Sequence, residues 1–306
     1  MRFSAGEIAA VVLSVAICSA VLNYFLARCS VAWGLVAIPS EARWHKRPTP
    51  NTGGIGILAS CALAYLLVAP GENAVIASAA VALGIAGMLD DRLRFPPALK
   101  LACQSSCALI VVANGNVLPV SPQYGVNAVI SFLWLIGIAN ATNLIDNMDG
   151  LCAGVIAIIA IFRMRAEFAA GDASALIMLA ILAGGFAGFL VVNWKPARIF
   201  MGDCGSMFGG FTLAALCLVG NGAQAQPSAR WVGYLALTFL YPVFDTLLVS
   251  IARTARGQSI AVGGKDHSSH ILVRSGLSER VTVGLIWIVS AGSALTGLLI
   301  YPEAVR

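Results

Sequence analysis

Long apolar segments alternate with short polar ones along most of this chain. The apolar segments are about 17–24 residues long, enough for a helix to cross roughly 30 Å of hydrocarbon. In lipid, a helix satisfies every backbone hydrogen-bonding group within its own segment. We therefore predict an all-α, polytopic integral membrane protein with about ten transmembrane helices. They are expected at residues 6–27, 53–70, 73–89, 97–113, 126–143, 150–168, 173–192, 206–222, 230–251 and 281–301.

Composition supports a membrane protein. Hydrophobic residues make up 59% of the 306 residues, and only 11% are charged. A soluble domain could not cover its surface with so few charges. The eight cysteines are scattered through the apolar segments without a C-x-x-C pair, so we interpret them as small packing residues rather than as a metal or redox site.

Positive charge is distributed unevenly between the two sets of loops. Most of the 19 Lys and Arg residues follow the odd-numbered spans. The positive-inside rule then places those loops in the cytoplasm and both termini outside. The cytoplasmic loops are expected near residues 28–52, 90–97, 143–150, 193–206 and 252–280. The net charge of +5 thus reflects membrane topology, and no basic patch interleaved with aromatic residues suggests a nucleic-acid partner.

Five polar segments fall in these cytoplasmic loops, and we expect them to form one site. The first is HKRPTPNTGG, residues 45–54. Lys46 could hold a phosphate, and Gly53 and Gly54 let backbone N–H groups approach an anion at a helix N-terminus. An ordinary basic loop with a Pro/Gly turn is the alternative interpretation.

The second segment is LDDRLRFPPALK, which ends the third span and starts the fourth. Asp90 and Asp91 are adjacent carboxylates at a helix C-terminus, where they repel each other and oppose the helix dipole. A divalent metal, or a substrate bound through one, would relieve both effects. Lys100 could bind a phosphate or anchor the helix at the membrane surface.

The third segment, NATNLIDNMDGL, spaces its polar residues by three: Asn140, Asn143, Asp146 and Asp149. On a continuous helix the four side chains would share a face. Carboxylate and amide oxygens suit Mg²⁺ and the polar edges of a nucleoside. The alternative is a capped helical corner that ends at Gly150.

The fourth segment is NWKPARIFMGDCGS, residues 193–206. Asp203 lies near the start of the eighth span, as a Mg²⁺ ligand or as a helix N-cap contributing only about 1 kcal/mol. Phe200 offers a ring to a base, and Asn193 a hydrogen-bonding edge.

The fifth segment, GGKDHSSH, places His267 and His270 three residues apart. Two His residues alone are a weak zinc signal, but they could hydrogen-bond a pyrophosphate or a sugar. Asp245, inside the ninth span, is expected to support the site by a hydrogen bond to a neighbouring helix or to a cation.

These five motifs occur together in the order shown by one family. HKRPTPNTGG, LDD with its following Lys, NxxNxxDxxDGL, NxxPAxxFMGDxGS and the His-containing loop resemble the polyprenyl-phosphate N-acetylhexosamine-1-phosphate transferases (glycosyltransferase family 4), over about residues 40–280. The resemblance implies a single transmembrane catalytic domain over residues 1–306, in the bacterial inner membrane, with its active site on the cytoplasmic face. It also implies Mg²⁺ (or Mn²⁺), a UDP-N-acetylhexosamine donor, undecaprenyl phosphate as acceptor and UMP as product.

The resemblance assigns roles to residues of this chain. The implied roles are catalysis for Asp90, Asp91 and Asp203; metal binding for Asp203 and Asn143; nucleotide binding for Lys46, Asp146, Asp149, Asn193 and Phe200; and phosphate or sugar binding for Lys100, His267 and His270.

The His loop distinguishes two branches of the family. The peptidoglycan branch, which uses UDP-MurNAc-pentapeptide, usually has three consecutive His residues there, whereas GGKDHSSH resembles the branch that transfers GlcNAc-1-phosphate to start surface polysaccharides. Ser269 stands where His is usual, and Asn147 where Gly is usual. The peptidoglycan transferase remains the alternative. A secondary transporter is remote, because the sequence shows neither midplane polar residues nor a repeat. A homodimer is left open.

Overall fold

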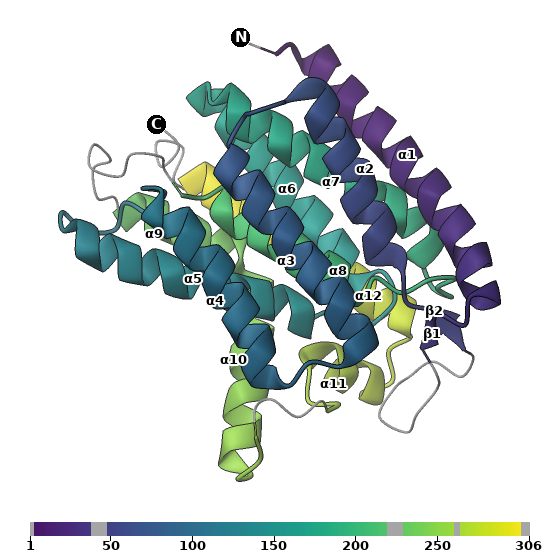
Figure 1. Ribbon diagram of the computed structural model, residues 1–306. Helices are drawn as coiled ribbons and strands as arrows, with labels where there is room; N and C mark the ends of the chain where they lie inside the picture. The colour runs from purple at the N-terminus through teal and green to yellow at the C-terminus, as the bar shows by residue number, and fades with distance from the viewer. Residues whose placement is uncertain (1–2, 38–47, 219–228, 260–263, 301–306) are drawn as a thin grey trace.

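A computed structural model describes residues 3–37, 48–218, 229–259 and 264–300, which form a bundle of helices (Figure 1). The helices are α1 (Ala5–Ala32), α2 (Gly53–Val68), α3 (Ala74–Leu93), α4 (Pro97–Ala113), α5 (Tyr124–Leu144), α6 (Leu151–Ala170), α7 (Ala173–Asn193), α8 (Gly202–Ala215), α9 (Ala229–Thr238), α10 (Leu240–Ala255), α11 (Ser268–Arg274) and α12 (Glu279–Ile300). Two short strands, β1 (Val36–Ala37) and β2 (Thr49–Pro50), pair antiparallel with Val36 opposite Pro50.

Several helices begin where local sequence favours a start. At α1, the Ser4 hydroxyl accepts the Glu7 N–H at 3.2 Å, and the Ser4 N–H donates to the Glu7 carboxylate at 2.7 Å. At α7, the Asp172 carboxylate accepts the Ala175 N–H at 2.9 Å. α4 opens with Pro97 in its first turn, where no N–H partner is needed. Such caps satisfy N–H groups that the helix itself leaves unpaired.

The helical membrane class predicted from the sequence is confirmed. Each of the ten predicted segments contains helix, and the bounds of α4 match the expected 97–113. By length and composition, five helices (α1, α3, α5, α7 and α12) can cross a membrane, or six if the bent pair α9–α10 counts as one span. The total of ten spans stays a prediction.

The ninth predicted span is wrong as a single helix. Residues 230–251 form parts of α9 and α10, which meet at Phe239 with a bend of 73°. Pro242 explains the position of the break, because a proline removes one backbone hydrogen bond and its ring clashes with the carbonyl four residues earlier, here Thr238. Buried Phe239 stabilises the corner by packing edge-to-face on Trp134, with 5.0 Å between the ring centroids. α10 then leaves the bundle at the lower end of Figure 1.

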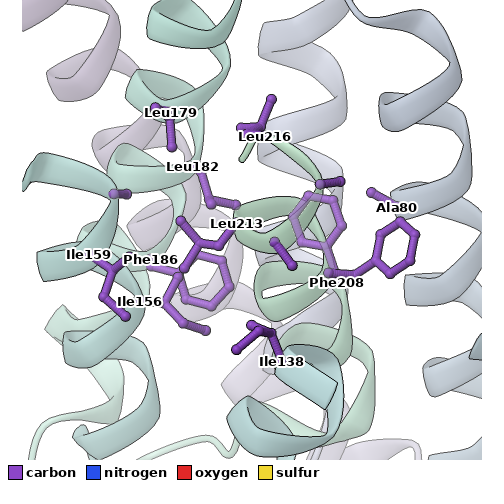
Figure 2. Close-up of a cluster of buried hydrophobic side chains, with 14 of the residues drawn as sticks. Ala80, Ile138, Ile156, Ile159, Leu179, Leu182, Phe186, Phe208, Leu213 and Leu216 are labelled. Carbon is purple, nitrogen blue, oxygen red and sulfur yellow. The ribbon is translucent and has the colours of Figure 1, made fainter. Parts of the chain in front are cut away.

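The core lies where α6, α7 and α8 meet. Figure 2 shows Ile156 of α6 and Phe186 of α7 packed around Leu213 of α8, all fully buried. Close backbone approach holds α1 on α7: a Cβ added at Gly188 would lie 2.1 Å from the Ala16 carbonyl oxygen. Small residues permit such packing between helices in lipid.

The outer helices expose large apolar side chains such as Leu67 (72%) and Ile288 (69%). A soluble protein rarely leaves so many in contact with water. The exposed surface is therefore suited to lipid, while α8 stays enclosed with its N-terminus directed at the polar loops.

Candidate active site

Hydrogen bonds join polar segments that are far apart in the sequence. Gly53 and Gly54, at the start of α2, donate their N–H groups to the carbonyls of Phe200 and Met201, each at 2.9 Å. The Phe200 N–H in turn donates to the Pro50 carbonyl at 2.8 Å. The two glycines of the first motif are thus bound to backbone of the fourth motif, and the N-termini of α2 and α8 are fixed together.

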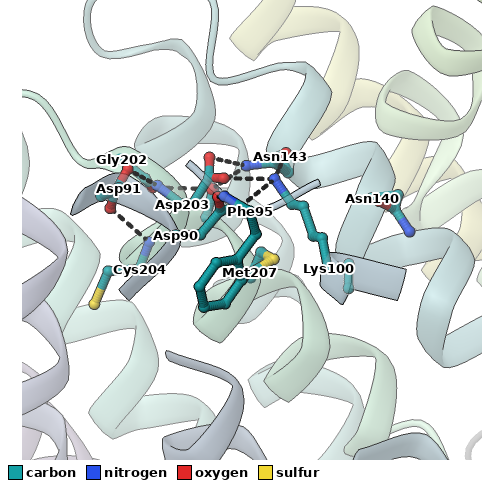
Figure 3. Close-up of polar contacts among 12 residues, drawn as sticks. Asp90, Asp91, Phe95, Lys100, Asn140, Asn143, Gly202, Asp203, Cys204 and Met207 are labelled. Carbon is teal, nitrogen blue, oxygen red and sulfur yellow. Dashed lines mark hydrogen bonds and ion pairs between the residues drawn. The ribbon is translucent and has the colours of Figure 1, made fainter. Parts of the chain in front are cut away.

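Lys100 of α4 lies at the centre of the polar cluster (Figure 3). Its Nζ is 2.5 Å from Asp203 Oδ2, 3.0 Å from Asn143 Oδ1 and 3.5 Å from Asp90 Oδ2. The three oxygens come from α8, α5 and α3. Three helices therefore direct oxygen atoms at one cation, and the Lys100 ammonium is that cation in this structure. Asp90 is fixed further by accepting the Phe95 N–H at 2.7 Å.

Asp203 is the second residue of α8 and does not cap its own helix. Met201 occupies the N-cap position. Asn143 Nδ2 donates to Asp203 Oδ1 at 2.8 Å and to Ser206 Oγ at 2.9 Å. Both carboxylate oxygens of Asp203 therefore face the cluster, one toward Lys100 and one toward Asn143. The interpretation of Asp203 as only an N-cap is wrong.

Asp91 supplies the capping hydrogen bonds of α8 instead, although it belongs to α3. Its Oδ1 accepts the Asp203 N–H at 3.0 Å, and its Oδ2 accepts the Cys204 N–H at 3.2 Å. Asn51 also donates to Oδ1, at 3.0 Å. A carboxylate at a helix N-terminus is stabilised by the helix dipole and by the otherwise unpaired N–H groups. Asp91 thus fixes the first turn of α8, and with it the direction of Asp203.

Gly87 makes this contact between α3 and α8 sterically possible. A Cβ at Gly87 would lie 2.6 Å from both the carbonyl carbon and the carbonyl oxygen of Asp203. These are backbone atoms, which cannot rotate away as a side chain can. Only a glycine lets the two helices approach this closely beside Asp90 and Asp203.

The corner between α5 and α6 carries a second group of predicted residues. Asn193, 5% exposed, donates Nδ2 to the Ile199 carbonyl and accepts the Gly150 N–H, both at 2.8 Å. Asp149 Oδ2 accepts the Ala197 N–H at 3.0 Å. Both side chains tie the loop before α8 to this corner. The structure thus gives them bridging positions beside the cluster.

Asp146 lies at the same corner, in a different electrostatic setting. Burial, with the nearby charges of Asp203, Asp91 and Asp149, raises the pKa of Asp146 to about 8. Without a cation, the protonated form of this carboxyl is therefore favoured at neutral pH. The fourth member of the spaced set, Asn140, turns away from the cluster (Figure 3) and exchanges two hydrogen bonds with Gln104, at 2.7 and 3.2 Å.

The His loop is fixed by Asp245 of α10, which is fully buried. Asp245 Oδ2 pairs with His267 Nδ1 at 2.7 Å, and Oδ1 accepts the Ser268 N–H at 2.7 Å and the Ser268 hydroxyl at 2.6 Å. The hydrogen bond predicted from Asp245 to a neighbouring helix is confirmed, at the start of α11. Because Nδ1 of His267 is engaged, Nε2 is the ring nitrogen left for other chemistry. Burial and the neighbouring His267 lower the pKa of His270, which favours its neutral form.

The two positions that differ from the motif pattern contact each other. Ser269 Oγ donates to Asn147 Oδ1 at 2.8 Å, and Asn147 Nδ2 donates to the Leu144 carbonyl at 3.0 Å. The His loop is thereby joined to the α5–α6 corner. Lys46 lies outside the described residues, and Phe200 is half-buried beside the start of α2.

Comparison with known proteins agrees with the motifs. The model of glycosyl transferase family 4 matches residues 73–221. A probable undecaprenyl-phosphate N-acetylglucosaminyl 1-phosphate transferase of Bacillus subtilis is 28% identical over 283 residues, covering 88% of this chain and 78% of that protein. A decaprenyl-phosphate N-acetylglucosaminephosphotransferase of Mycolicibacterium smegmatis is 31% identical over 337 residues, covering 95% and 82%. The chain belongs to glycosyl transferase family 4.

This family 4 enzyme is a membrane-embedded sugar-phosphate transferase. It is also similar to a phospho-N-acetylmuramoyl-pentapeptide-transferase of a Synechococcus species, 28% identical over 287 residues that cover 86% of this chain and 79% of that protein. Transferases named for N-acetylglucosamine and for the muramoyl pentapeptide thus both resemble it. Membership of the family establishes the class of reaction. It does not identify the donor sugar, because transferases named for two different sugars resemble the chain.

Two residues of this family 4 site have no role in the sequence-based prediction. Asn51 binds Asp91, and Ser206 binds Asn143 and the Gly202 carbonyl. Both lie inside predicted motifs, PNTGG and GDCGS, so their presence near the site could be predicted from the sequence. Their partners lie on other helices, which hydropathy and spacing along one chain do not identify.

Proposed function

We propose that the enzyme transfers N-acetylglucosamine 1-phosphate from UDP-GlcNAc to undecaprenyl phosphate, with Mg²⁺ and release of UMP, and so starts a cell-surface polysaccharide. The observation that carries the proposal is the convergence of Asp203, Asn143 and Asp90 oxygens on one cation, beside a helix N-terminus. A polyprenyl-phosphate acceptor is supported by the names of the two N-acetylglucosamine transferases above.

The donor set fits Mg²⁺. Carboxylate and amide oxygens are the ligands this hard cation prefers. Among the described residues, no group of three or more His, Cys, Asp and Glu side chains could hold a metal by itself. Mg²⁺ is commonly bound by one or two carboxylates plus substrate phosphates and water. Asp203 and Asn143 would supply the protein ligands, and Mn²⁺ could replace Mg²⁺ there. When bound, the metal would neutralise charge on the pyrophosphate as the bond to UMP breaks.

The reaction is one phosphoryl transfer. A phosphate oxygen of the lipid acceptor forms a bond to the sugar-bearing phosphorus, the bond from that phosphorus to the bridging oxygen breaks, and UMP leaves with that oxygen. Asp90 would position the acceptor phosphate or take its proton. Lys100, released from Asp203 when a metal binds, would offer its ammonium to a phosphate. These groups act by positioning and charge, which dominate phosphoryl transfer.

The remaining predicted residues divide by their contacts. Asp146, Phe200 and Lys46 keep the proposed nucleotide-binding role, and His267 and His270 the proposed contacts to phosphate or sugar. Asp149 and Asn193 would support the nucleotide through the loop they hold, and Asp91 would serve catalysis by fixing α8 and Asp203.

The proposed setting is the bacterial inner membrane, with the polar loops in the cytoplasm and both termini outside. The uneven distribution of Lys and Arg supports this orientation. Reporter fusions at the two ends and in the loop near residues 252–258 would test it, and a cytoplasmic N-terminus would contradict it.

The decisive experiment compares donors. Purified enzyme is incubated with Mg²⁺, undecaprenyl phosphate and labelled UDP-GlcNAc, UDP-GalNAc or UDP-MurNAc-pentapeptide, and UMP and labelled lipid are measured. We expect product with UDP-GlcNAc, and none from the folded Asp203→Ala variant. Product with UDP-MurNAc-pentapeptide alone would assign the enzyme to peptidoglycan synthesis instead. Exchange of labelled UMP into UDP-GlcNAc without acceptor would indicate a covalent phospho-aspartate step.

A further inference from the structure

His270 lies in the short helix α11, and His267 is the N-cap residue of that helix. Its N-terminal end is fixed to α10, where Asp245 binds His267 and Ser268. A further side-chain hydrogen bond runs from Ser269 to Asn147, at the α5–α6 corner. The Asp245 contacts hold α11 against α10, its neighbour along the chain. The Ser269–Asn147 hydrogen bond holds it against the α5–α6 corner, which carries Asp146 and Asp149.

The Ser269–Asn147 contact has the properties of a specific link. Ser269 is fully buried, so its hydroxyl loses water on folding and depends on this partner. Asn147 is oriented independently, because its Nδ2 donates to the Leu144 carbonyl at the end of α5. The amide therefore presents its oxygen, and not its nitrogen, to Ser269. Both ends of the contact are thus fixed before a substrate arrives.

The link joins two segments that each carry predicted site residues. His270 follows Ser269 directly, and Asp146 precedes Asn147 directly. The rings of His267 and His270 lie 5.5 Å apart and nearly perpendicular, so a shift of α11 would move both. The hydrogen bond between Ser269 and Asn147 therefore helps to set the spacing between the histidine pair and the α5–α6 corner.

We propose that Ser269 and Asn147 are positioning residues, whose contact sets the distance between the His267–His270 pair and the α5–α6 corner and thereby the fit of the donor's pyrophosphate and sugar. This role rests on the proposed function for its effect on the donor. The contact itself is a claim about the protein alone, and it can be tested without substrate.

The kinetic test uses Ser269→Ala, Asn147→Ala and the double variant, with Ser275→Ala as the control. Ser275 is an exposed residue just after α11, and within the described part of the chain its hydroxyl binds the Leu272 carbonyl of that helix. Each single variant should raise the donor KM about five- to tenfold, as expected for one lost hydrogen bond. The acceptor KM should stay unchanged. The double variant should resemble the worse single variant, because both remove the same contact.

The second measurement needs no activity. Diethyl pyrocarbonate modifies accessible histidines, and mass spectrometry reads each site. His267 and His270 are 4% and 3% exposed. Both should react several-fold faster in the two single variants than in the wild type or Ser275→Ala.

The outcomes separate the two proposals. Unchanged histidine labelling in both variants, or additive kinetic effects in the double variant, would overturn the positioning role. A wild-type enzyme that releases UMP from no UDP-amino-sugar would overturn the proposed function, and the labelling would still decide whether the link holds α11. A general loss of folding is distinguishable, because it would lower kcat with both KM values unchanged.

Discussion

Replacing Gly87 by Ala should disable the enzyme through backbone contact alone. The added Cβ would lie 2.6 Å from the carbonyl carbon and oxygen of Asp203, about 0.8 Å inside the 3.4 Å at which ordinary contact begins. The first turn of α8 must retreat by a similar distance, since backbone atoms cannot rotate away. Overpacking of this kind costs about 1–3 kcal/mol of stability.

The same displacement acts on the catalytic geometry. Asp203 is held at 2.5 Å from Lys100 and 2.8 Å from Asn143, and both contacts would stretch beyond good hydrogen-bonding distance. A misplacement near 1 Å can cost on the order of 100-fold in rate. We therefore expect Gly87→Ala to lower kcat for UMP release roughly 10- to 100-fold and to lower the melting temperature in detergent.

Gly137→Ala is the matched control for this change. Gly137 lies in α5, and a Cβ there would meet no atom within 4 Å. The control gains helix propensity, up to about 1 kcal/mol, without a clash. If folded Gly87→Ala turned over within twofold of Gly137→Ala, the claim that close α3–α8 packing sets the position of Asp203 would be refuted.

Three further changes probe the site. Asn193→Ala leaves two backbone partners unpaired and should destabilise the protein by about 2–4 kcal/mol in thermal unfolding; the exposed Asn114→Ala should cost far less, and equal losses would contradict the bridging role. Lys100→Met removes the ammonium from among the converging oxygens. Mn²⁺ should therefore bind more tightly, as measured by electron paramagnetic resonance, while turnover falls at least about 100-fold. Weaker Mn²⁺ binding would contradict the proposal that the metal and the lysine use the same oxygen atoms. The raised pKa of Asp146, about 8, means that the folded protein keeps a proton that the unfolded chain releases near pH 4. Stability without metal should therefore fall as pH rises from about 4 through 8, and Asp146→Asn should flatten that slope in EDTA; equal slopes would show that Asp146 does not titrate there.

Much of the helical framework could be predicted from the chain alone. The ends of α4 match the predicted segment, and α7 begins at the predicted residue 173. Both results follow from local physics, because an apolar run in lipid must satisfy its backbone internally and therefore becomes a helix. The break at Phe239 was also signalled locally, by Pro242, although the hydropathy of the ninth segment concealed it.

The site shows the same contrast between features set by local sequence and features set by packing. Its residue types were identifiable because polar groups are costly beside apolar spans and so stand out. Their partners were not. Asp91 was expected to do chemistry like Asp90, yet it binds the N-terminus of α8 while Asp90 faces Lys100. Adjacent residues on a helix point about 100° apart, so only the packing of α3 against α8 and α4 separates their roles.

Asp203 shows most clearly what the order of residues and the tertiary packing each contribute. The order of residues alone places this carboxylate in a Gly-rich turn at the start of an apolar helix, because composition and order along the chain are local facts. It left open whether that carboxylate caps its helix or binds a cation. The packing of α3 on α8 excludes the capping role, because Asp91, 112 positions away along the chain, already occupies the N–H groups of α8. The Asp203 oxygens are thereby left to Lys100 and Asn143, and under the proposed function to Mg²⁺.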